Sequence, residues 1–337
     1  MRSHLVNRIL TATAAAALAS TLLSACGGGS DGTTVTVGVG GNIFDMPIRV
    51  ADAKGYFRQQ GLTVKYVTLT ASTGSSALES GSVQFLNTSP TDFLSARRQG
   101  LKHLAIGHDG GGNPLGLVVS TTFAKAHDLT SKTPPAQVAK ALAHSTAGAS
   151  SANTKAEAGL YLRAYGVDPG KLKWVSLPSP AADKAALNKD EIDWFVTSEP
   201  IPLQLQQTGD GVVVADPLTV PQWSYTQAGY GQLLTVKTSY AAQNAATVQK
   251  FATAIQRATN YMHGHLHSGA VLGAARTALP GIPDSVLAGS LDQVEWPASD
   301  RMSAGDWTKT TGFINSLGVL PNKLTVSSDD WTNKYLP

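Results

Sequence analysis

The sequence predicts an α/β protein with largely parallel sheets. Strand-like and helix-like segments alternate from about residue 35 onward, and this alternation is typical of a parallel sheet covered by helices on both faces. Two stretches, SALESGSVQFLNTSP and AALNKDEIDWFVTSEP, share one order of short helix, turn, apolar strand and hydroxyl-rich loop closed by proline. This internal similarity predicts two lobes of similar construction.

The first elements follow from local residue preferences. Residues 35–39 alternate as a strand and are followed by the glycine-rich loop GGNIF, after which a helix begins near Pro47, because proline suits the first helical turn. Gly61 fits the left-handed position just past a helix end. Residues 62–69 then alternate apolar and polar side chains, which predicts a strand with one buried face.

Later segments show the same signals for helix ends and strands. We expect a helix capped by Ser72 or Thr73 and ended at Gly81, a third strand in VQFLNTSP, a helix in TDFLSARRQG and a strand in LKHLAIGHDGG. A second set follows, with a helix at 154–165 and a strand at 173–177. The last hundred or so residues are predicted to be mainly helical, because ATVQKFATAIQRATNYMHGHL carries apolar residues at helical spacing.

Composition limits the class of protein. The chain has 337 residues, 42% hydrophobic and 15% charged, which is enough for two domains of ordinary size. The formal net charge is +3, and it falls close to neutral without Arg2 and Arg8 at the N-terminus. A nucleic-acid-binding protein would show a clustered basic face, so nucleic acid is excluded as a partner.

Residues 1–25 are predicted to be a lipoprotein signal peptide. Arg2 and Arg8 precede an apolar stretch that is shorter than the roughly 20 apolar residues of a membrane-spanning helix. The motif LSAC then resembles a bacterial lipobox, which implies lipidation of Cys26, the only cysteine of the chain. Residues 26–33 would form a flexible tether. An uncleaved anchor helix is the alternative, and both place the protein at the outer face of a membrane.

Two longer runs carry a family resemblance. ADAKGYFRQQGLTVKYVTLTASTGSSALESGSVQF and GVDPGKLKWVSLP with AALNKDEIDWFVTSEP resemble, in order and spacing, the solute-binding lipoproteins of ABC importers in the nitrate, sulfonate and taurine (SsuA/TauA/NMT1-THI5-like) family. The likeness covers most of the chain from Val35. It implies a type II periplasmic-binding-protein fold, with residues 34–116 and 229–337 as lobe 1, residues 117–228 as lobe 2, and two crossover segments between them.

The resemblance also implies a function. We expect an extracytoplasmic, lipid-anchored monomer that captures a small solute between closing lobes, works with an ABC permease, and needs no cofactor. The alternatives are a sensor that presents its closed form to a receptor, and a synthase-like enzyme, which would need a cysteine-rich stretch that this chain lacks. GVGGNIF is no dinucleotide fingerprint, because Ile43 replaces the third glycine, and in GASSA the residue Ala152 replaces the last glycine of a nucleophile elbow.

The candidate site residues lie in the loops after the predicted strands, because open α/β sheets bind ligands at the carboxyl ends of their strands. They are Gly41, Asn42, Phe44, Ser72, Thr73, Asn87, Thr88 and Ser89 in lobe 1, and Ser151, Asn153, Thr154 and Glu199 in lobe 2, with Trp223 as a stacking wall. Helix capping is the alternative role of each hydroxyl residue.

The charge of these loops is compatible with two classes of solute. They carry no lysine or arginine, although Arg49 and Lys155 lie within a helical turn or two. Amide and hydroxyl groups also hold anions, whereas Glu199 disfavours them. The solute is therefore either a sulfonate- or nitrate-like anion or an aromatic or heterocyclic nutrient.

The motif HGHLH contains histidines at a spacing that metal sites can use. His263 and His267 share a helical face at a spacing that suits zinc or nickel, but no nearby cysteine or acid completes a ligand shell. A solvated helix end is the preferred interpretation, and no metal is predicted.

Overall fold

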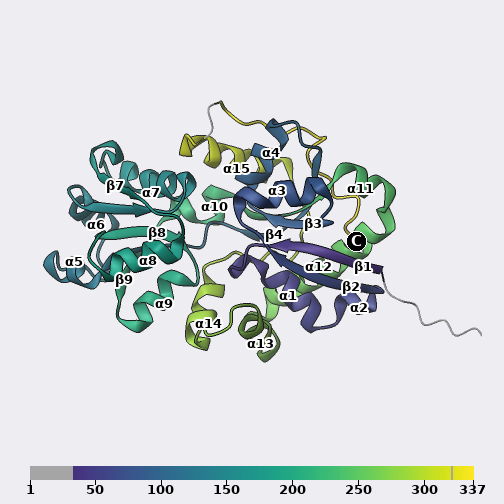
Figure 1. The fold of residues 1–337 in the computed structure, drawn as a ribbon, viewed down its shortest axis with the longest axis horizontal. Helices are drawn as coiled ribbons and strands as arrows, with labels where there is room; N and C mark the ends of the chain where they lie inside the picture. Colours follow the sequence, from purple (N-terminus) through teal and green to yellow (C-terminus); the bar gives the residue numbers. More distant parts are fainter. Residues whose placement is uncertain (1–32, 320–321) are drawn as a thin grey trace, which may run out of the picture. The chain divides into compact units, whose positions relative to one another are not determined.

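Two five-stranded sheets organise the chain (Figure 1). The computed structural model describes residues 33–319 and 322–337. The predicted signal peptide, Cys26 and the tether up to residue 32 lie outside the described residues.

Sheet A has the strand order β2-β1-β3-β10-β4. Strands β2 and β3 pair in parallel with β1, whereas β10 runs antiparallel to both β3 and β4. The strands are β1 (Thr33–Val39), β2 (Leu62–Thr68), β3 (Phe85–Thr88), β4 (His103–Gly111) and β10 (Tyr230–Lys237).

Sheet B repeats this arrangement in the order β7-β6-β8-β5-β9. Here β7 and β8 are parallel to β6, and β5 is the antiparallel strand in fourth place. Its strands are β5 (Leu115–Ser120), β6 (Thr146–Ala149), β7 (Lys173–Ser176), β8 (Trp194–Ser198) and β9 (Gly211–Ala215). The predicted α/β class with mostly parallel sheets is confirmed.

Helices cover both faces of each sheet. Those before β4 are η1 (Ile43–Asp45), α1 (Met46–Ala53), α2 (Tyr56–Gln59), α3 (Ala71–Ser80) and α4 (Pro90–Arg98). Those between β5 and β9 are α5 (Thr121–Ala126), α6 (Pro135–Leu142), α7 (Ala152–Ala164), η2 (Pro169–Lys171), α8 (Pro180–Asn188) and α9 (Ile201–Thr208). The others are η3 (Pro221–Trp223), α10 (Tyr225–Ala228), α11 (Thr238–Gln243), α12 (Ala245–His265), α13 (Gly269–Ala278), α14 (Asp284–Asp292) and α15 (Ala304–Leu317).

Local signals explain several element ends. Gly61 and Gly81 both adopt positive φ, +69° and +79°, as predicted for residues that end a helix. Gly61 follows the C-cap of α2, and Gly81 is itself the C-cap of α3. The predicted cap of α3 was wrong, because Thr70 is the N-cap and forms a capping box with Thr73. The extended backbone of Thr70 suits this position, so the N-cap of α3 lies two or three residues earlier than expected.

Each sheet has its own hydrophobic core. In sheet A the rings of Phe85 and Phe251 stack at 3.8 Å between centroids, and α12 buries its apolar side chains there, as its spacing predicted. In sheet B the core gathers around Trp194, Tyr161 and Trp223. We call residues 33–111 and 230–337 the sheet A half, and residues 115–215 the sheet B half.

Candidate functional site

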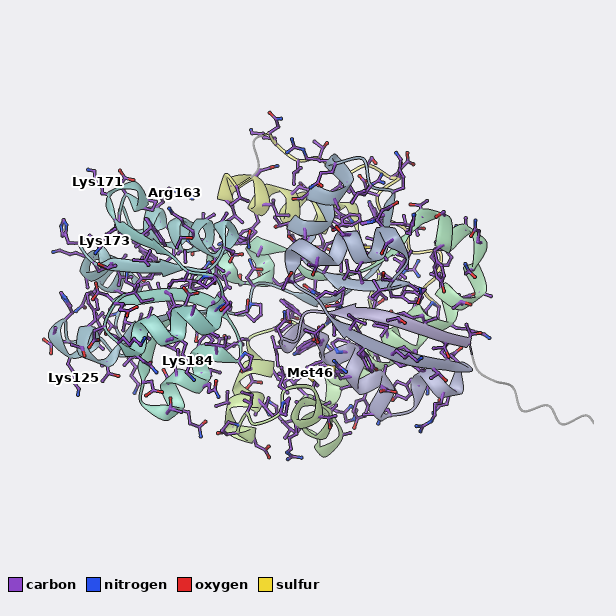
Figure 2. All side chains as sticks on the ribbon, in the orientation of Figure 1. Met46, Lys125, Arg163, Lys171, Lys173 and Lys184 are labelled. Atoms are coloured by element: carbon purple, nitrogen blue, oxygen red, sulfur yellow. The ribbon has the colours of Figure 1, made fainter. Side chains whose placement is uncertain are left out.

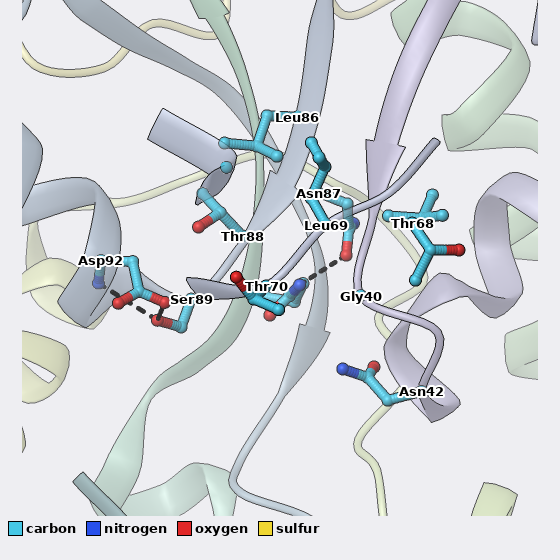
Figure 3. Close-up of a pocket in the computed structure, with 13 residues that line it drawn as sticks. Gly40, Asn42, Thr68, Leu69, Thr70, Leu86, Asn87, Thr88, Ser89 and Asp92 are labelled. Atoms are coloured by element: carbon cyan, nitrogen blue, oxygen red, sulfur yellow. Dashed lines mark hydrogen bonds between the residues drawn. The ribbon is translucent and has the colours of Figure 1, made fainter. Parts of the chain in front are cut away.

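A pocket of about 320 Å³ lies at the carboxyl ends of β1, β2 and β3 (Figure 3). The starts of α3 and α4 and the side chain of Gln232 on β10 complete its walls. Val39, Leu69 and Leu86 give it one apolar side, and hydroxyl and amide side chains give it a polar side. The lining residues that the structure describes all belong to the sheet A half.

Of the sequence-predicted site residues whose side chains the structure describes, four line this pocket: Asn42, Asn87, Thr88 and Ser89. Among the described residues, the Thr88 hydroxyl has no hydrogen-bond partner in the protein, so it is available to a solute. Ser89 instead caps α4, where its Oγ accepts from the amide of Asp92 at 3.1 Å.

The other predicted residues of this half lie beside the pocket. Gly41 donates its amide to Asp45, and Phe44 is buried against Gly110 and Gly231. Thr73 completes the cap of α3. The side chain of Ser72 lies outside the described part of the structure.

Sequence reasoning missed several lining residues. Thr68 ends β2, Leu69 directly follows it, and Asp92 lies in the first turn of α4, so the rule that strand ends form the site could have found them. Gln232 could not have been found in this way, because it belongs to a strand that returns to sheet A from more than a hundred residues away.

A buried carboxylate holds the backbone turn after β1. The side chain of Asp45, only 1% exposed, accepts from the amides of Gly40 at 3.0 Å, Gly41 at 2.6 Å and Asn42 at 3.3 Å. Burial raises the pKa of Asp45, while these amides and the charge of Arg49 act in the opposite direction. All three backbone partners are N–H donors, an arrangement that favours the ionised carboxylate over the protonated form.

A buried amide chain lies behind the pocket. Asn87 Nδ2 donates to Asp109 Oδ2 at 2.6 Å, and Gln232 Nε2 donates to Asn87 Oδ1 at 2.5 Å. With its amide nitrogen and oxygen exchanged, Gln232 would instead accept from the amide of Thr88 at 3.2 Å and donate to the carbonyl oxygen of Gly231 at 3.2 Å. Burial and the charge of Asp45 raise the pKa of Asp109 to about 8, so its side chain is mostly protonated at neutral pH.

Three predicted residues lie at the start of α7, and one of them, Asn153, lines a cavity together with the start of α4. Ser151 caps α7 by accepting from the amide of Thr154 at 3.0 Å. Asn153 Nδ2 donates to Glu157 Oε1 at 3.0 Å, and burial raises the pKa of Glu157 to about 8. Asn153, Glu157 and Ser89 line a second, smaller cavity of about 30 Å³, so this part of the sheet B half lies close to the sheet A pocket.

Glu199 and Trp223 lie away from the pocket. Glu199 is buried and accepts from Ser290 Oγ at 3.0 Å and from the amide of Leu203 at 3.4 Å, which links the start of α9 to α14. Trp223 is fully buried in the sheet B core, with its ring 5.8 Å from that of Tyr161. Neither side chain is among those that line the pocket.

The three histidines of HGHLH have separate partners. His263 Nδ1 lies 2.8 Å from the carbonyl oxygen of Trp296, and His267 Nε2 lies 2.8 Å from Asp292 Oδ1. Within residues 33–319 and 322–337, no three His, Cys, Asp or Glu side chains are grouped to hold a metal ion. None of the helices in the described part of the chain is both long and apolar enough to cross a membrane.

Comparison with protein families matches residues 43–266 to the family described as NMT1/THI5 like. The chain belongs to the NMT1/THI5-like family. The family predicted from the sequence is therefore confirmed, and the matched region contains strands of both sheets as well as Asn87, Thr88 and Ser89. A search of curated proteins found no matching sequence.

Solved structures share the fold of this NMT1/THI5-like chain. The periplasmic aliphatic sulphonate binding protein SsuA from Escherichia coli has a TM-score of 0.69 at 15% identity, over 90% of this chain and 99% of that one. SsuA from Xanthomonas axonopodis pv. citri, bound to MOPS, has a TM-score of 0.67 at 16% identity, over 87% and 96%. The periplasmic nitrate-binding protein NrtA from Synechocystis PCC 6803 has a TM-score of 0.64 at 15% identity, over 86% and 83%. The predicted periplasmic-binding-protein fold is thus confirmed.

Proposed function

We propose that this protein is an extracytoplasmic solute-binding lipoprotein of an ABC importer. The observation that carries the proposal is the pocket at the carboxyl ends of β1, β2 and β3, in a chain with the periplasmic-binding-protein fold. Open α/β sheets bind ligands at this edge, and about 320 Å³ suits a small solute. The protein binds its solute without transforming it.

In the proposed mechanism the sheet A half holds the solute and the sheet B half closes over it. Ser89 and Asn153 line the same small cavity, so the start of α7 lies close to the pocket. This proximity supports closure of the sheet B half over the solute. The connections at residues 112–114 and 216–229 would act as the hinge between two lobes. Solute contacts made only in the closed form would stabilise that form, which then docks on a membrane permease.

Anchoring is assigned to the N-terminal segment. Cleavage before Cys26 and lipidation of its sulfur would hold the protein, as a monomer, at the extracytoplasmic face of the cell membrane. Replacing Cys26 by serine is expected to move the protein from the membrane fraction to the soluble fraction of exported protein.

Solute binding is tested by a thermal-shift screen of the chain from Cys26 onward, carrying Cys26→Ser. The screen includes sulfonates, nitrate, pyrimidines, flavins, aromatic acids, amines and amides. A native-state ligand must raise the melting temperature in a saturable manner. Small-angle scattering should then show a smaller radius of gyration with the solute bound.

Thr88→Val tests whether the solute binds in the pocket, because it removes a hydroxyl without changing the shape of the side chain. Loss of one hydrogen bond of about 1.4 kcal/mol weakens binding about tenfold. Thr63→Val, on the exposed face of β2, makes the same chemical change away from the pocket and should leave binding unchanged. Equal effects of the two substitutions would place the solute elsewhere.

A further inference from the structure

We propose that the pocket takes a small solute that carries an amine, amidine or amide N–H group and no net negative charge, and that it rejects sulfonate- and nitrate-like oxyanions. This inference rests on the proposed function, because it concerns the same pocket. Three features of the pocket support it: the charges of its walls, the hydrogen-bond state of its backbone amides, and the acceptor that it offers.

The walls carry a negative group and no positive one. Asp92 is the charged residue among the lining residues, and none of those that the structure describes is lysine or arginine. The two cations nearest in sequence to the predicted loops lie over aromatic rings. The Arg49 guanidinium is 3.9 Å from the ring centre of Tyr66, and Lys155 Nζ is 5.0 Å from that of Trp174.

Other basic residues of the sheet B half also lie on elements that do not line the pocket. Figure 2 places Lys125, Arg163, Lys171, Lys173 and Lys184 on α5, α7, η2, β7 and α8. Most of them are exposed. An oxyanion in the pocket would therefore lack the cation that commonly neutralises such a ligand.

Backbone amides could replace a cation, but the turn after β1 already contains an anion of its own. The Asp45 carboxylate accepts from the amides of Gly40, Gly41 and Asn42, the kind of consecutive donors that bind oxyanions in other proteins. A sulfonate or nitrate group would have to displace a buried carboxylate that cannot leave the chain. It would also be repelled by the charge of Asp45.

The helices that begin at the pocket are capped by their own side chains. Thr70 and Thr73 form the capping box of α3, and the Ser89 hydroxyl accepts from the amide of Asp92 at the start of α4. These internal acceptors satisfy amide donors that would otherwise be offered to an anion. The N-terminal helix ends are therefore less able to hold an oxyanion than bare ones.

Asp92 supplies an acceptor for a donating solute. Its Oδ2 accepts from Ser89 Oγ at 2.8 Å, whereas its Oδ1 has no hydrogen-bond partner among the residues that the structure describes. Burial raises the pKa of Asp92, which means that the carboxylate gains from a nearby positive or N–H-donating group. We assign Asp92 Oδ1 as the acceptor for the solute's N–H group.

The test uses four probes of similar size: butylamine, butyramide, butyrate and butanesulfonate. Thermal shift and calorimetry on the Cys26→Ser chain are expected to show saturable binding of butylamine or butyramide. Neither butyrate nor butanesulfonate is expected to bind. Asp92→Asn should weaken amine binding about tenfold, which is the loss of one charge-assisted contact. Asp306→Asn is the matched control, because Ser303 and Asp306 form the same cap at the start of α15, outside this pocket.

A variant at Asp45 tests whether this carboxylate keeps oxyanions from the amides after β1. Asp45→Ala frees the three amides, so nitrate is expected to stabilise this variant in a saturable manner and to leave the wild type unchanged. If the variant folds poorly, the stabilisation by nitrate is read as recovery of folded protein. The same nitrate response in the wild type would overturn the inference.

The outcomes separate this inference from the proposed function. Saturable binding of butanesulfonate that Thr88→Val weakens would overturn the charge preference and leave a solute-binding pocket in place. Binding of none of the four probes would also overturn the preference as stated. The wider solute screen then decides the proposed function by itself.

Discussion

The carboxyl edges of the two sheets have the same strand order and different contents. Strands β3 and β8 hold the same place in sheets A and B. After β3, Ser89 caps α4 and the Thr88 hydroxyl is left facing a pocket. After β8, the Glu199 carboxylate turns inward to Ser290 and the amide of Leu203. Topology thus creates two equivalent edges, and the residues just past each strand decide what each edge binds.

The largest expected effect is a loss of stability in the hydrophobic core of sheet B, away from the pocket. Trp223→Ala should lower the free energy of unfolding by about 3–5 kcal/mol, because it removes a fully buried indole from that core. Urea denaturation measures this loss. Solute affinity of the folded variant should change little. A variant that folds as stably as the wild type but no longer binds solute would place this ring against the solute instead.

A second prediction concerns the pH dependence of stability. The pKa of Glu157 is raised to about 8 in the fold, from an ordinary value of 4.5, so between these values the folded chain keeps a proton that the unfolded chain has released. The stability that protonated Glu157 contributes is therefore fully present below about pH 4.5, and it is lost as the pH rises towards 8. Each such group contributes a slope of at most about 1.4 kcal/mol per pH unit.

Glu157→Gln should make this slope shallower, because an amide cannot ionise. Urea unfolding at several pH values between 5 and 8 measures the change. Glu191→Gln, at an exposed position of the same half, should leave the slope as it is. An identical slope in the wild type and Glu157→Gln would mean that Glu157 ionises with little penalty in the fold.

The smallest expected effects are the losses of stability when either of two matched helix caps is removed. Ser89 caps α4 and Ser151 caps α7, each by accepting an amide hydrogen bond, at 3.1 Å and 3.0 Å. Ser89→Ala and Ser151→Ala should each cost about 1 kcal/mol of stability. Only Ser89→Ala should also lower the affinity for the solute, as measured by calorimetry. Equal losses of affinity would show that both halves contact the solute to the same extent.

The sequence predicted much of the fold because its signals are local. Glycines at helix ends, alternation in strands and helical spacing in α12 act over a few residues, and the structure confirms them at Gly61, Gly81 and Phe251. The cap of α3 was assigned two or three residues too late, because Thr70, Ser72 and Thr73 all have suitable hydroxyls. Only the backbone conformation selects Thr70 among them.

The sequence by itself determined the family, the α/β class and the loops in which a site would lie, since strand ends, helix starts and motif order are properties of short segments. The tertiary structure alone decided which of these loops meet. It brought Gln232 to the pocket through a returning strand, took Trp223 into the core, and directed Glu199 to Ser290. It also placed Asp45 on the amides after β1. Such contacts depend on packing between segments that are distant in sequence, or on side-chain direction within a turn, and residue type alone specifies neither.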